Sequence, residues 1–572
     1  MKISIKKQDY FFYFLILCMF IIYLILIFNS SYVGYSDCAS NSVVAKNLIS
    51  NNGFKVDAVH YFFVKYPSLP RPEDTWPLLQ PIFIGISYLL FGVGVVSAKI
   101  PNLLFFLILS ILTYHISLNL FNRKVAYIAG FLILFNPYYL FSHYILFPYN
   151  DLGFTLLLLS SFYFFHKSII FINHNKKRFY KYLFLTSIFA TLSFLQKQPG
   201  LLLFIIIPFY LFIFNFKNYS KSIYKFRKNY FYGSIIFTIK SISIYLVLPF
   251  IAYILIKIRE VLIKGYLGAY PYVIYVDRFT NVFSNPIMIF YDNLPNLKLA
   301  YLNFPIYFQT LLIQIKEWLI NPPSILFFSF YLIYFFYIKG KSKKIMDFSN
   351  TFFNISFIFF LLHSIAIVFL YVYEYRYFSI YIPYICILAA KIAYDLYNSI
   401  YKLIMNKASL FNKKKLIKKI YCFCLLFLVL SFLISSLFIS LPRINNYLDK
   451  NEILELHKFV DEKLPENSVI LSRNEFALSF YTNQKVIGFP LLDYNQLIDL
   501  VKHYNITHII TTPIYIEFYT DSKILSLIKG KEINGFKKIH EMHNVYISSK
   551  DLDRSKKEIF IYEIEDSSIF LE

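Results

Sequence analysis

Long apolar runs alternate with short polar connections over most of the chain. Each run approaches the length of about 20 residues that a helix needs to cross a bilayer core of about 30 Å. The pattern predicts a polytopic α-helical membrane protein with about eleven transmembrane helices. These are predicted over residues 10–28, 100–121, 125–142, 152–170, 182–197, 200–215, 241–258, 322–338, 351–372, 377–397 and 420–440.

Basic residues are concentrated in every second connection between these runs. The clusters lie at 2–7, 123–124, 176–181, 217–240, 339–344 and 402–419, whereas the other short connections carry almost no charge. Cytoplasmic loops of membrane proteins collect Lys and Arg. We therefore expect a cytoplasmic N-terminus, with the C-terminal segment and the uncharged loops on the outer face of the membrane.

One further apolar segment, 76–98, is also long enough to span. Counting it as a crossing would place every basic cluster from Arg123 onward outside, against the charge bias. Two prolines and a Gly92-Val93-Gly94 break would also interrupt a regular helix here. We expect an outer-face juxtamembrane helix that lies at the interface or is partly re-entrant.

The distribution of charge excludes a nucleic-acid-binding groove. The chain is 58% hydrophobic and 16% charged, with a net charge of +24. Residues 441–572 hold 16 Lys and Arg against 20 Asp and Glu, so the positive excess lies in the short loops of 1–440. That placement is typical of cytoplasmic loops. The five cysteines show no disulfide or zinc-ligand spacing.

The last part of the chain has a different pattern. It predicts a small extracytoplasmic α/β domain over 441–572, after a transmembrane domain over 1–440. Short strands are predicted at 469–472, 485–489 and 508–512, and helices at 449–464 and 493–504. No glycine-rich phosphate loop opens these helices, so the pattern does not predict a nucleotide-binding domain.

Two aspartates stand at helix ends on the predicted outer face. Asp37 follows the first run, and Asp151 lies at the tip between the third and fourth runs. Two carboxylates on one face can supply a general base and an electrostatic or metal partner. The structural alternatives are a solvated loop acid at Asp37 and a helix N-cap at Asp151. A divalent metal stays open.

Cationic side chains fall on the same face. Lys197, in a short turn, and Arg376, at the end of another run, are candidates for contact with a lipid-linked phosphate. The alternatives are a snorkelling lysine at Lys197 and a local ion pair between Arg376 and Glu374. Glu374, His143 and Trp76 are possible accessory residues.

The order of several short segments resembles the GT-C superfamily of membrane glycosyltransferases. The nearest branch is that of the protein O-mannosyltransferases and the lipid A aminoarabinose transferases. An acid follows the first span, and 192–200 is similar to the Leu-Thr-Lys-Gly turn of the family. Other matching segments include AKNL at 45–48, NGF at 52–54, WPLLQP at 76–81 running to Phe91-Gly92, AKIPNL at 98–103, Leu120-Phe121, Asn136-Pro137 before Asp151, and 376–383. The resemblance covers about residues 10–400.

The resemblance implies transfer of a sugar from a polyprenyl-phosphate-linked donor, outside the cytoplasmic membrane. The acceptor would be a hydroxyl group of a protein, a lipid or a glycan. Asp37 takes the place of the first-loop acid, which acts as general base in an inverting, in-line displacement. Asp151 matches the second-loop acid, and Lys197 and Arg376 match cations near the donor phosphate.

Three departures from the family pattern bear on this reading. Cys38 stands where the first motif usually has a second acid, and Trp76 stands where the aminoarabinose branch has a lysine. With tryptophan at 76 and 318 alone, the Trp-Trp-Asp signature of oligosaccharyltransferases is absent from the sequence. That disfavours transfer of an oligosaccharide to asparagine.

Two other kinds of protein remain as alternatives. One is a lipid-linked sugar flippase or polysaccharide polymerase, and the other is a non-catalytic glycan-assembly protein. A transporter should place ionisable residues near the middle of its spans and often shows related halves. Few charges lie deep in the apolar runs and no repeat is evident, which favours the enzyme.

Overall fold

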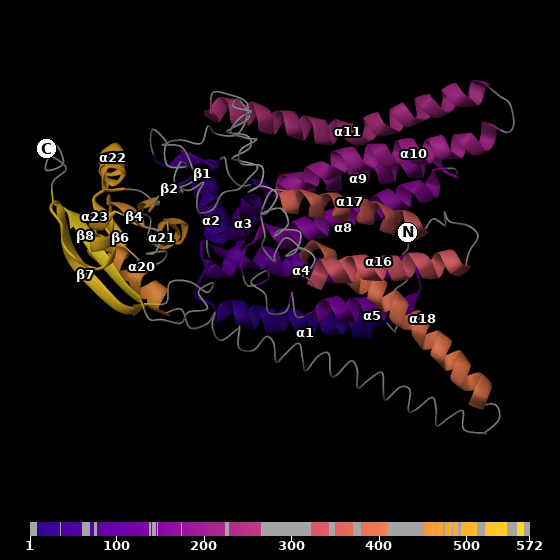
Figure 1. Cartoon of the computed structure of the whole chain (residues 1–572), viewed down its shortest axis with the longest axis horizontal. Coiled ribbons are helices and arrows are strands. Elements are labelled where there is room, and N and C mark those ends of the chain that lie inside the picture. Colours follow the sequence, from indigo (N-terminus) through magenta and orange to yellow (C-terminus); the bar gives the residue numbers. More distant parts are fainter. Residues whose placement is uncertain are drawn as a thin grey trace.

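The computed structural model describes a bundle of long helices joined to a sheet with flanking helices (Figure 1). The described residues are 9–34, 36–59, 69–73, 77–136, 139, 145, 147–172, 174–223, 228–264, 322–341, 349–369, 379–408, 451–472, 475–482, 484–489, 493–511, 521–545 and 557–565. The span predicted at 420–440 lies outside these residues. The predicted domain boundary at residue 440 does so as well.

Most helices of the bundle run side by side along the long axis of the molecule, and α18 crosses it obliquely (Figure 1). Six described helices are long and apolar enough to cross a membrane, so the chain is a helical membrane protein by length and composition. Each helix of the bundle overlaps a predicted span. The bundle contains α1 (Asp9–Phe28), α4 (Val95–Leu120), α5 (Arg123–Leu134), α8 (Asn150–Phe171), α9 (Lys176–Gln196), α10 (Leu203–Ile223), α11 (Lys228–Lys264), α16 (Pro322–Lys341), α17 (Ser349–Phe369) and α18 (Ile382–Ala408).

α1 is apolar on all sides, but only one stripe of it is buried by protein. Phe12, Ile16, Met19, Tyr23 and Ile27 recur at spacings of three and four residues and pack on the bundle. The remaining faces expose large apolar side chains, which a bilayer would cover with lipid. These exposed residues include Tyr10, Phe11, Phe14, Leu17, Ile21 and Ile25.

A partly buried ion pair joins three helices at the end of the bundle away from the sheet. Arg123 Nε lies 3.0 Å from Asp9 Oδ1, and the Tyr114 hydroxyl donates to the same carboxylate at 2.7 Å. A carboxylate among apolar helices needs a cation and hydrogen-bond donors close by. The pair therefore fixes the start of α1 and the start of α5 against α4.

The apolar segment 76–98 is interrupted where the glycines predict a break. α3 (Leu79–Phe91) ends at Gly92, which has a φ of 81°, and α4 begins at Val95. A helix of 13 residues is about 20 Å long and shorter than a bilayer core. α3 packs against α4 and against α2 (Ser36–Ile49), at the end of the bundle next to the sheet (Figure 1).

Five strands of the C-terminal region and β2 (Ala58–Val59), from the loop after α2, form a six-stranded sheet in the order β2-β5-β4-β6-β8-β7. The first four strands are parallel, and β8 and β7 are antiparallel to their neighbours. The sequence predicts β4, β5, β6, α20 and α22 near their observed positions, but not β7, β8, α21 or α23. The bounds are β4 (Val469–Ser472), β5 (Lys485–Gly488), β6 (His508–Thr511), β7 (Phe536–Val545), β8 (Lys557–Ile564), α20 (Asn451–Lys463), α21 (Glu475–Thr482), α22 (Tyr494–Tyr504) and α23 (Ser522–Ile528).

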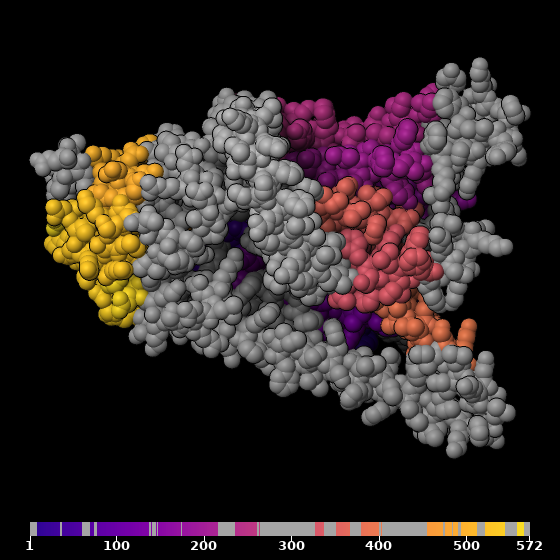
Figure 2. All heavy atoms as spheres, viewed as in Figure 1, coloured from indigo at the N-terminus to yellow at the C-terminus, as the bar shows by residue number. Residues whose placement is uncertain are grey.

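Two apolar cores cover the two faces of this sheet. Ile470 and Ile510 pack with α20 and α21 on one face, whereas Leu471 and Ile509 pack with α22 and α23 on the other. Successive residues of a strand point to opposite faces of the sheet. Because these strands have consecutive apolar residues, their side chains contribute to both cores. In the space-filling view this α/β region, in orange and yellow, occupies one end of the molecule (Figure 2).

The sheet takes an edge strand from the loop that follows α2. β2 (Ala58–Val59) pairs in parallel with β5, and the same loop holds a two-stranded pair of β1 (Lys55–Val56) and β3 (Arg71–Pro72). The Tyr481 hydroxyl of α21 accepts a hydrogen bond from the Val33 N–H at 2.7 Å and donates to the Ser31 carbonyl at 3.0 Å. The C-terminal region is thus attached on both sides of α2, which the sequence does not predict.

His457 of α20 should make this attachment sensitive to acid. Its ring is buried and stacks on Tyr481 with 4.4 Å between the centroids, and neither ring nitrogen has a partner among the described residues. Burial lowers the pKa of His457 to about 3, from an ordinary value of about 6.5. Below about pH 6.5 the unfolded chain therefore binds a proton that the folded protein does not.

We expect folding stability to fall as pH drops from about 6.5 toward 3, by up to about 1.4 kcal/mol per pH unit from this residue. His457→Phe keeps a stacked ring and removes the titration, so thermal unfolding of this variant should depend less on pH over that range. His503→Phe, at an exposed position on α22, is the matched control. Equal acid sensitivity in wild type and His457→Phe would show that the buried imidazole is not responsible.

Candidate functional site

α2 carries Asp37 in its first turn, directly after a turn that requires glycine. Gly34 has a φ of +113°, and a Cβ there would lie 2.7 Å from the Cβ of Cys38. The chain can therefore turn sharply between α1 and α2. Asp37 is half-buried at the N-terminal end of α2, where the helix dipole favours a carboxylate.

The side chain of Cys38 is buried in an apolar core and is not part of a polar site. It is fully buried in a core with Tyr32, Phe147 and residues of α21. Neighbouring residues on a helix point about 100° apart, so Cys38 and Asp37 occupy different sides of α2. A second carboxylate at position 38 would have to be buried among apolar side chains, at high cost.

Asp151 and Lys197 form an ion pair, which the sequence does not predict. Asp151 lies in the first turn of α8 and is 2% exposed, and Lys197 follows the last residue of α9 with its ammonium on the Asp151 carboxylate. Tyr149, not Asp151, is the N-cap of α8, so the N-cap alternative does not hold. An ammonium carries three N–H donors, so this pairing is compatible with a second acceptor such as a phosphate.

The backbone around Lys197 depends on a second glycine. α9 ends at Gln196, Lys197 is extended, and the short helix η1 (Gln198–Leu202) follows at once. A Cβ at Gly200 would lie 2.4 Å from the backbone nitrogen of Phe194, which cannot move without shifting α9. The absence of a side chain at Gly200 therefore allows the tight turn that places the ammonium.

Hydrogen bonds join the second turn of α2 to the start of α8. Asn41 donates to Asn150 Oδ1 at 2.7 Å and to the Pro148 carbonyl at 3.4 Å. Asn41 lies one turn after Asp37 on the same face of α2, and Asn150 directly precedes Asp151. The structure therefore gathers Asp37, Asp151 and Lys197 at the end of the bundle that adjoins the sheet.

The sequence does not single out several buried polar residues at this end of the bundle. Lys99 donates to Ser30 Oγ and lies 5.3 Å from the centroid of the Phe147 ring, so it ties α4 to the segment before Asp37. The sequence feature that could have identified them is the presence of polar residues inside apolar helices, all near the same end of the bundle. These fully buried residues are Gln80, Lys99, Asn102 and Gln196.

The remaining predicted site residues lie outside the described part of the chain. They are Trp76, His143, Glu374 and Arg376, whose roles stay predictions. A further acid does lie beside α2, because Ser40 donates to the buried Glu73 carboxylate at 3.5 Å. Arg259, near the end of α11, donates to the Glu73 carbonyl.

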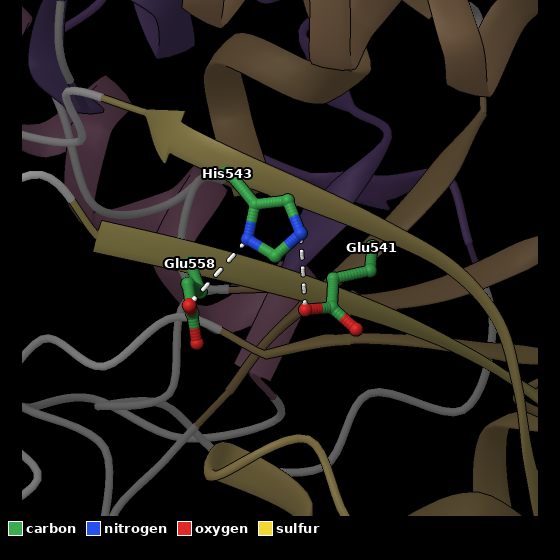
Figure 3. A group of neighbouring side chains, drawn as sticks. All are labelled: Glu541, His543 and Glu558. Atoms are coloured by element: carbon green, nitrogen blue, oxygen red, sulfur yellow. Dashed lines mark ion pairs between the residues drawn. The ribbon is translucent and has the colours of Figure 1, made fainter.

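One group with metal-ligand chemistry lies on the β7–β8 hairpin, at the sheet edge opposite β2. Among the described residues, Glu541, His543 and Glu558 are close enough together to share a cation (Figure 3). Both ring nitrogens of His543 already face a carboxylate, at 3.3 Å and 3.4 Å, and Lys538 pairs with Glu541. Ion pairing across the exposed hairpin accounts for this group.

Comparison with known proteins gives a partial family match. The family model for dolichyl-phosphate-mannose-protein mannosyltransferase matches residues 75–232, a stretch that contains Asp151 and Lys197. No match was found among curated proteins.

Several solved structures share the fold over nearly the whole chain. ArnT from Cupriavidus metallidurans bound to undecaprenyl phosphate superposes with a TM-score of 0.53 at 11% identity, over 96% of this chain and 98% of that one. The Archaeoglobus fulgidus oligosaccharyltransferase tethered with an acceptor peptide gives 0.55 at 13% identity, over 93% and 73%. AglB from the same organism, in complex with an inhibitory peptide and a dolichol-phosphate, gives 0.50 at 12%, over 96% and 75%. The likeness confirms the predicted GT-C fold.

Removing one partner of the Asp151–Lys197 pair should destabilise the protein more than removing both. Lys197→Met leaves the buried carboxylate without its cation, which should cost about 3 kcal/mol. Adding Asp151→Asn should recover most of that loss, because no charge then remains buried. Thermal unfolding in detergent measures both effects, with Lys177→Met at the exposed start of α9 as control. A double variant no more stable than Lys197→Met would argue against a direct pair.

Proposed function

We propose that this protein is a glycosyltransferase that moves a sugar from a polyprenyl-phosphate-linked donor to an acceptor hydroxyl on the outer face of the membrane. Support comes from the GT-C fold, the mannosyltransferase match over 75–232, and the undecaprenyl phosphate bound to ArnT. The observation that carries the proposal is the gathering of Asp37 with the Asp151–Lys197 pair at one end of the bundle.

Asp37 is the proposed general base. Its carboxylate accepts the proton of the acceptor hydroxyl as the hydroxyl oxygen attacks the anomeric carbon of the sugar. The bond between that carbon and the phosphate oxygen breaks in the same step, and polyprenyl phosphate leaves with the bonding electrons. Attack from the side opposite the phosphate inverts the anomeric configuration. Asp37 is half-buried, so neighbouring residues hold it while part of the residue stays accessible.

Lys197 and Arg376 are the proposed contacts of the donor phosphate. Negative charge accumulates on the leaving phosphate, and fixed cations stabilise it as the bond breaks. Because Asp151 is paired with Lys197, we assign Asp151 the role of holding this cation and not that of a second base. Glu374, His143 and Trp76 keep their proposed accessory roles.

The proposed acceptor is a hydroxyl group of a protein, lipid or glycan, with membrane lipids surrounding the bundle. The Archaeoglobus oligosaccharyltransferase holds an acceptor peptide, which makes a protein the first acceptor class to test. The N-terminus and the basic loops are proposed to be cytoplasmic, with the α/β region outside.

We expect Asp37→Asn to abolish sugar transfer while leaving the protein folded and inserted, because an amide cannot take the acceptor proton. Transfer from a labelled polyprenyl-phosphate sugar to a hydroxyl acceptor measures this with purified protein. Asp461→Asn, an exposed position on α20, is the matched control and should keep wild-type activity. Full activity in Asp37→Asn would refute the assignment of the base.

The proposed sidedness predicts which engineered cysteines a membrane-impermeant thiol reagent can reach. In a variant without native cysteines, Lys529→Cys in the α/β region should be labelled on intact cells. Lys177→Cys, in a basic connection between two helices, should be labelled only after permeabilisation. The reverse pattern would place the whole candidate site on the cytoplasmic face and rule out the proposed topology.

A further inference from the structure

A chain of buried amide side chains runs behind the candidate site. Gln196 donates through Nε2 to Gln80 Oε1 at 2.6 Å and to the Asn150 carbonyl at 3.2 Å. Gln80 in turn donates to Asn102 Oδ1 at 2.9 Å. Asn102 donates to the carbonyls of two residues before α8, at 2.7 Å and 3.0 Å. Gln80, Asn102 and Gln196 are all fully buried.

The chain of amides extends to the helix that carries the proposed base. Asn150 receives the Asn41 amide on its side-chain oxygen at 2.7 Å, while its own carbonyl receives Gln196. Five helices are therefore joined by amide groups: α2, α3, α4, α8 and α9. Two of the linked residues directly precede proposed site residues, since Asn150 is followed by Asp151 and Gln196 by Lys197.

The surface of α8 is shaped to admit this amide. A Cβ at Gly153 would lie 2.6 Å from Gln196 Nε2 and 3.0 Å from the ring of Phe105. Any larger residue would push the amide away from Asn150 and Gln80. The lack of a side chain at Gly153 thus allows Gln196 to approach α8 closely.

Amides suit this place for a physical reason. Apolar packing between helices tolerates small slides and rotations, whereas buried hydrogen bonds are directional and costly to break. An amide also adds no net charge beside the Asp151–Lys197 pair. The network can therefore hold the first turns of α2 and α8 and the end of α9 in one register without changing the charge of the site.

We propose that Gln196 is a positioning residue for sugar transfer, which holds Lys197 and Asp151 in register with the helix of Asp37 through Asn150 and Gln80. This inference rests on the proposed function. Gln196 acts through Lys197 and does not touch the substrate. Misplacement of a reacting group by about 1 Å can cost about 100-fold in rate.

The test compares Gln196→Met, which keeps the length of the side chain and removes the amide, with Ser160→Ala. Ser160 is a buried polar residue of α8 whose hydroxyl, among the described residues, bonds only within its own helix, to the Leu156 carbonyl. We expect kcat of Gln196→Met to fall by about 10- to 100-fold with KM for the donor changed less than about twofold. Ser160→Ala should keep wild-type values.

Gly153→Ala gives a second route to the same displacement and should lower kcat in the same way. A further measurement separates positioning from a general loss of stability. If Gln196 acts through Lys197, then Gln196→Met should cost much less in a Lys197→Arg background, where the cation is already displaced. If Gln196→Met lowers kcat by the same factor in the wild-type and Lys197→Arg backgrounds, the proposal is overturned.

Wild-type kcat in Gln196→Met, or loss of folded protein in both Gln196→Met and Gly153→Ala, would likewise overturn it. The activity of Asp37→Asn distinguishes failure of the proposed base from failure of the positioning role. Full activity in that variant refutes the proposed base, whereas abolished activity there together with normal kcat in Gln196→Met refutes only the positioning role.

Discussion

The candidate site depends on one ion pair held where α8 begins and α9 ends. The Asp151 carboxylate is buried among apolar helices and needs a cation, which the Lys197 ammonium supplies, so each fixes the position of the other. Two glycines make the approach possible, Gly200 in the turn after α9 and Gly153 on the face of α8. Buried amides then connect this pair to α2, so the charged groups and the proposed base share one framework.

The α/β region is part of the same framework. β2 joins its sheet from the loop after α2, and Tyr481 bonds to the backbone just before α2. The helix of Asp37 is therefore anchored on one side by the bundle and on the other by the sheet. A separate folding unit attached by a linker would not be held in this way. The arrangement explains why residues of α21 complete the core that buries Cys38.

Hydropathy and the charge rule were sufficient to predict the helices of the bundle and the shared end of Asp37, Asp151 and Lys197, because both are properties of short stretches of sequence. The pairing of Asp151 with Lys197 was not predictable, since sidedness gives no distances between helices. The contact of Gln196 with Gln80 joins residues 116 positions apart. β2 has two residues, too few to show an alternating pattern. Trp76, His143, Glu374 and Arg376 lie outside the described residues, so their predicted roles rest on sequence and resemblance.

Mass spectrometry of surface glycans and of polyprenyl-phosphate sugars, in cells with and without this gene, is the most direct test of the proposed sugar transfer to a surface acceptor. Without the gene, one sugar should disappear from a surface protein, lipid or glycan while its lipid-linked donor accumulates, and restoring the gene should reverse both changes. Unchanged glycans together with an unchanged donor pool would show that the chain does not carry out this transfer.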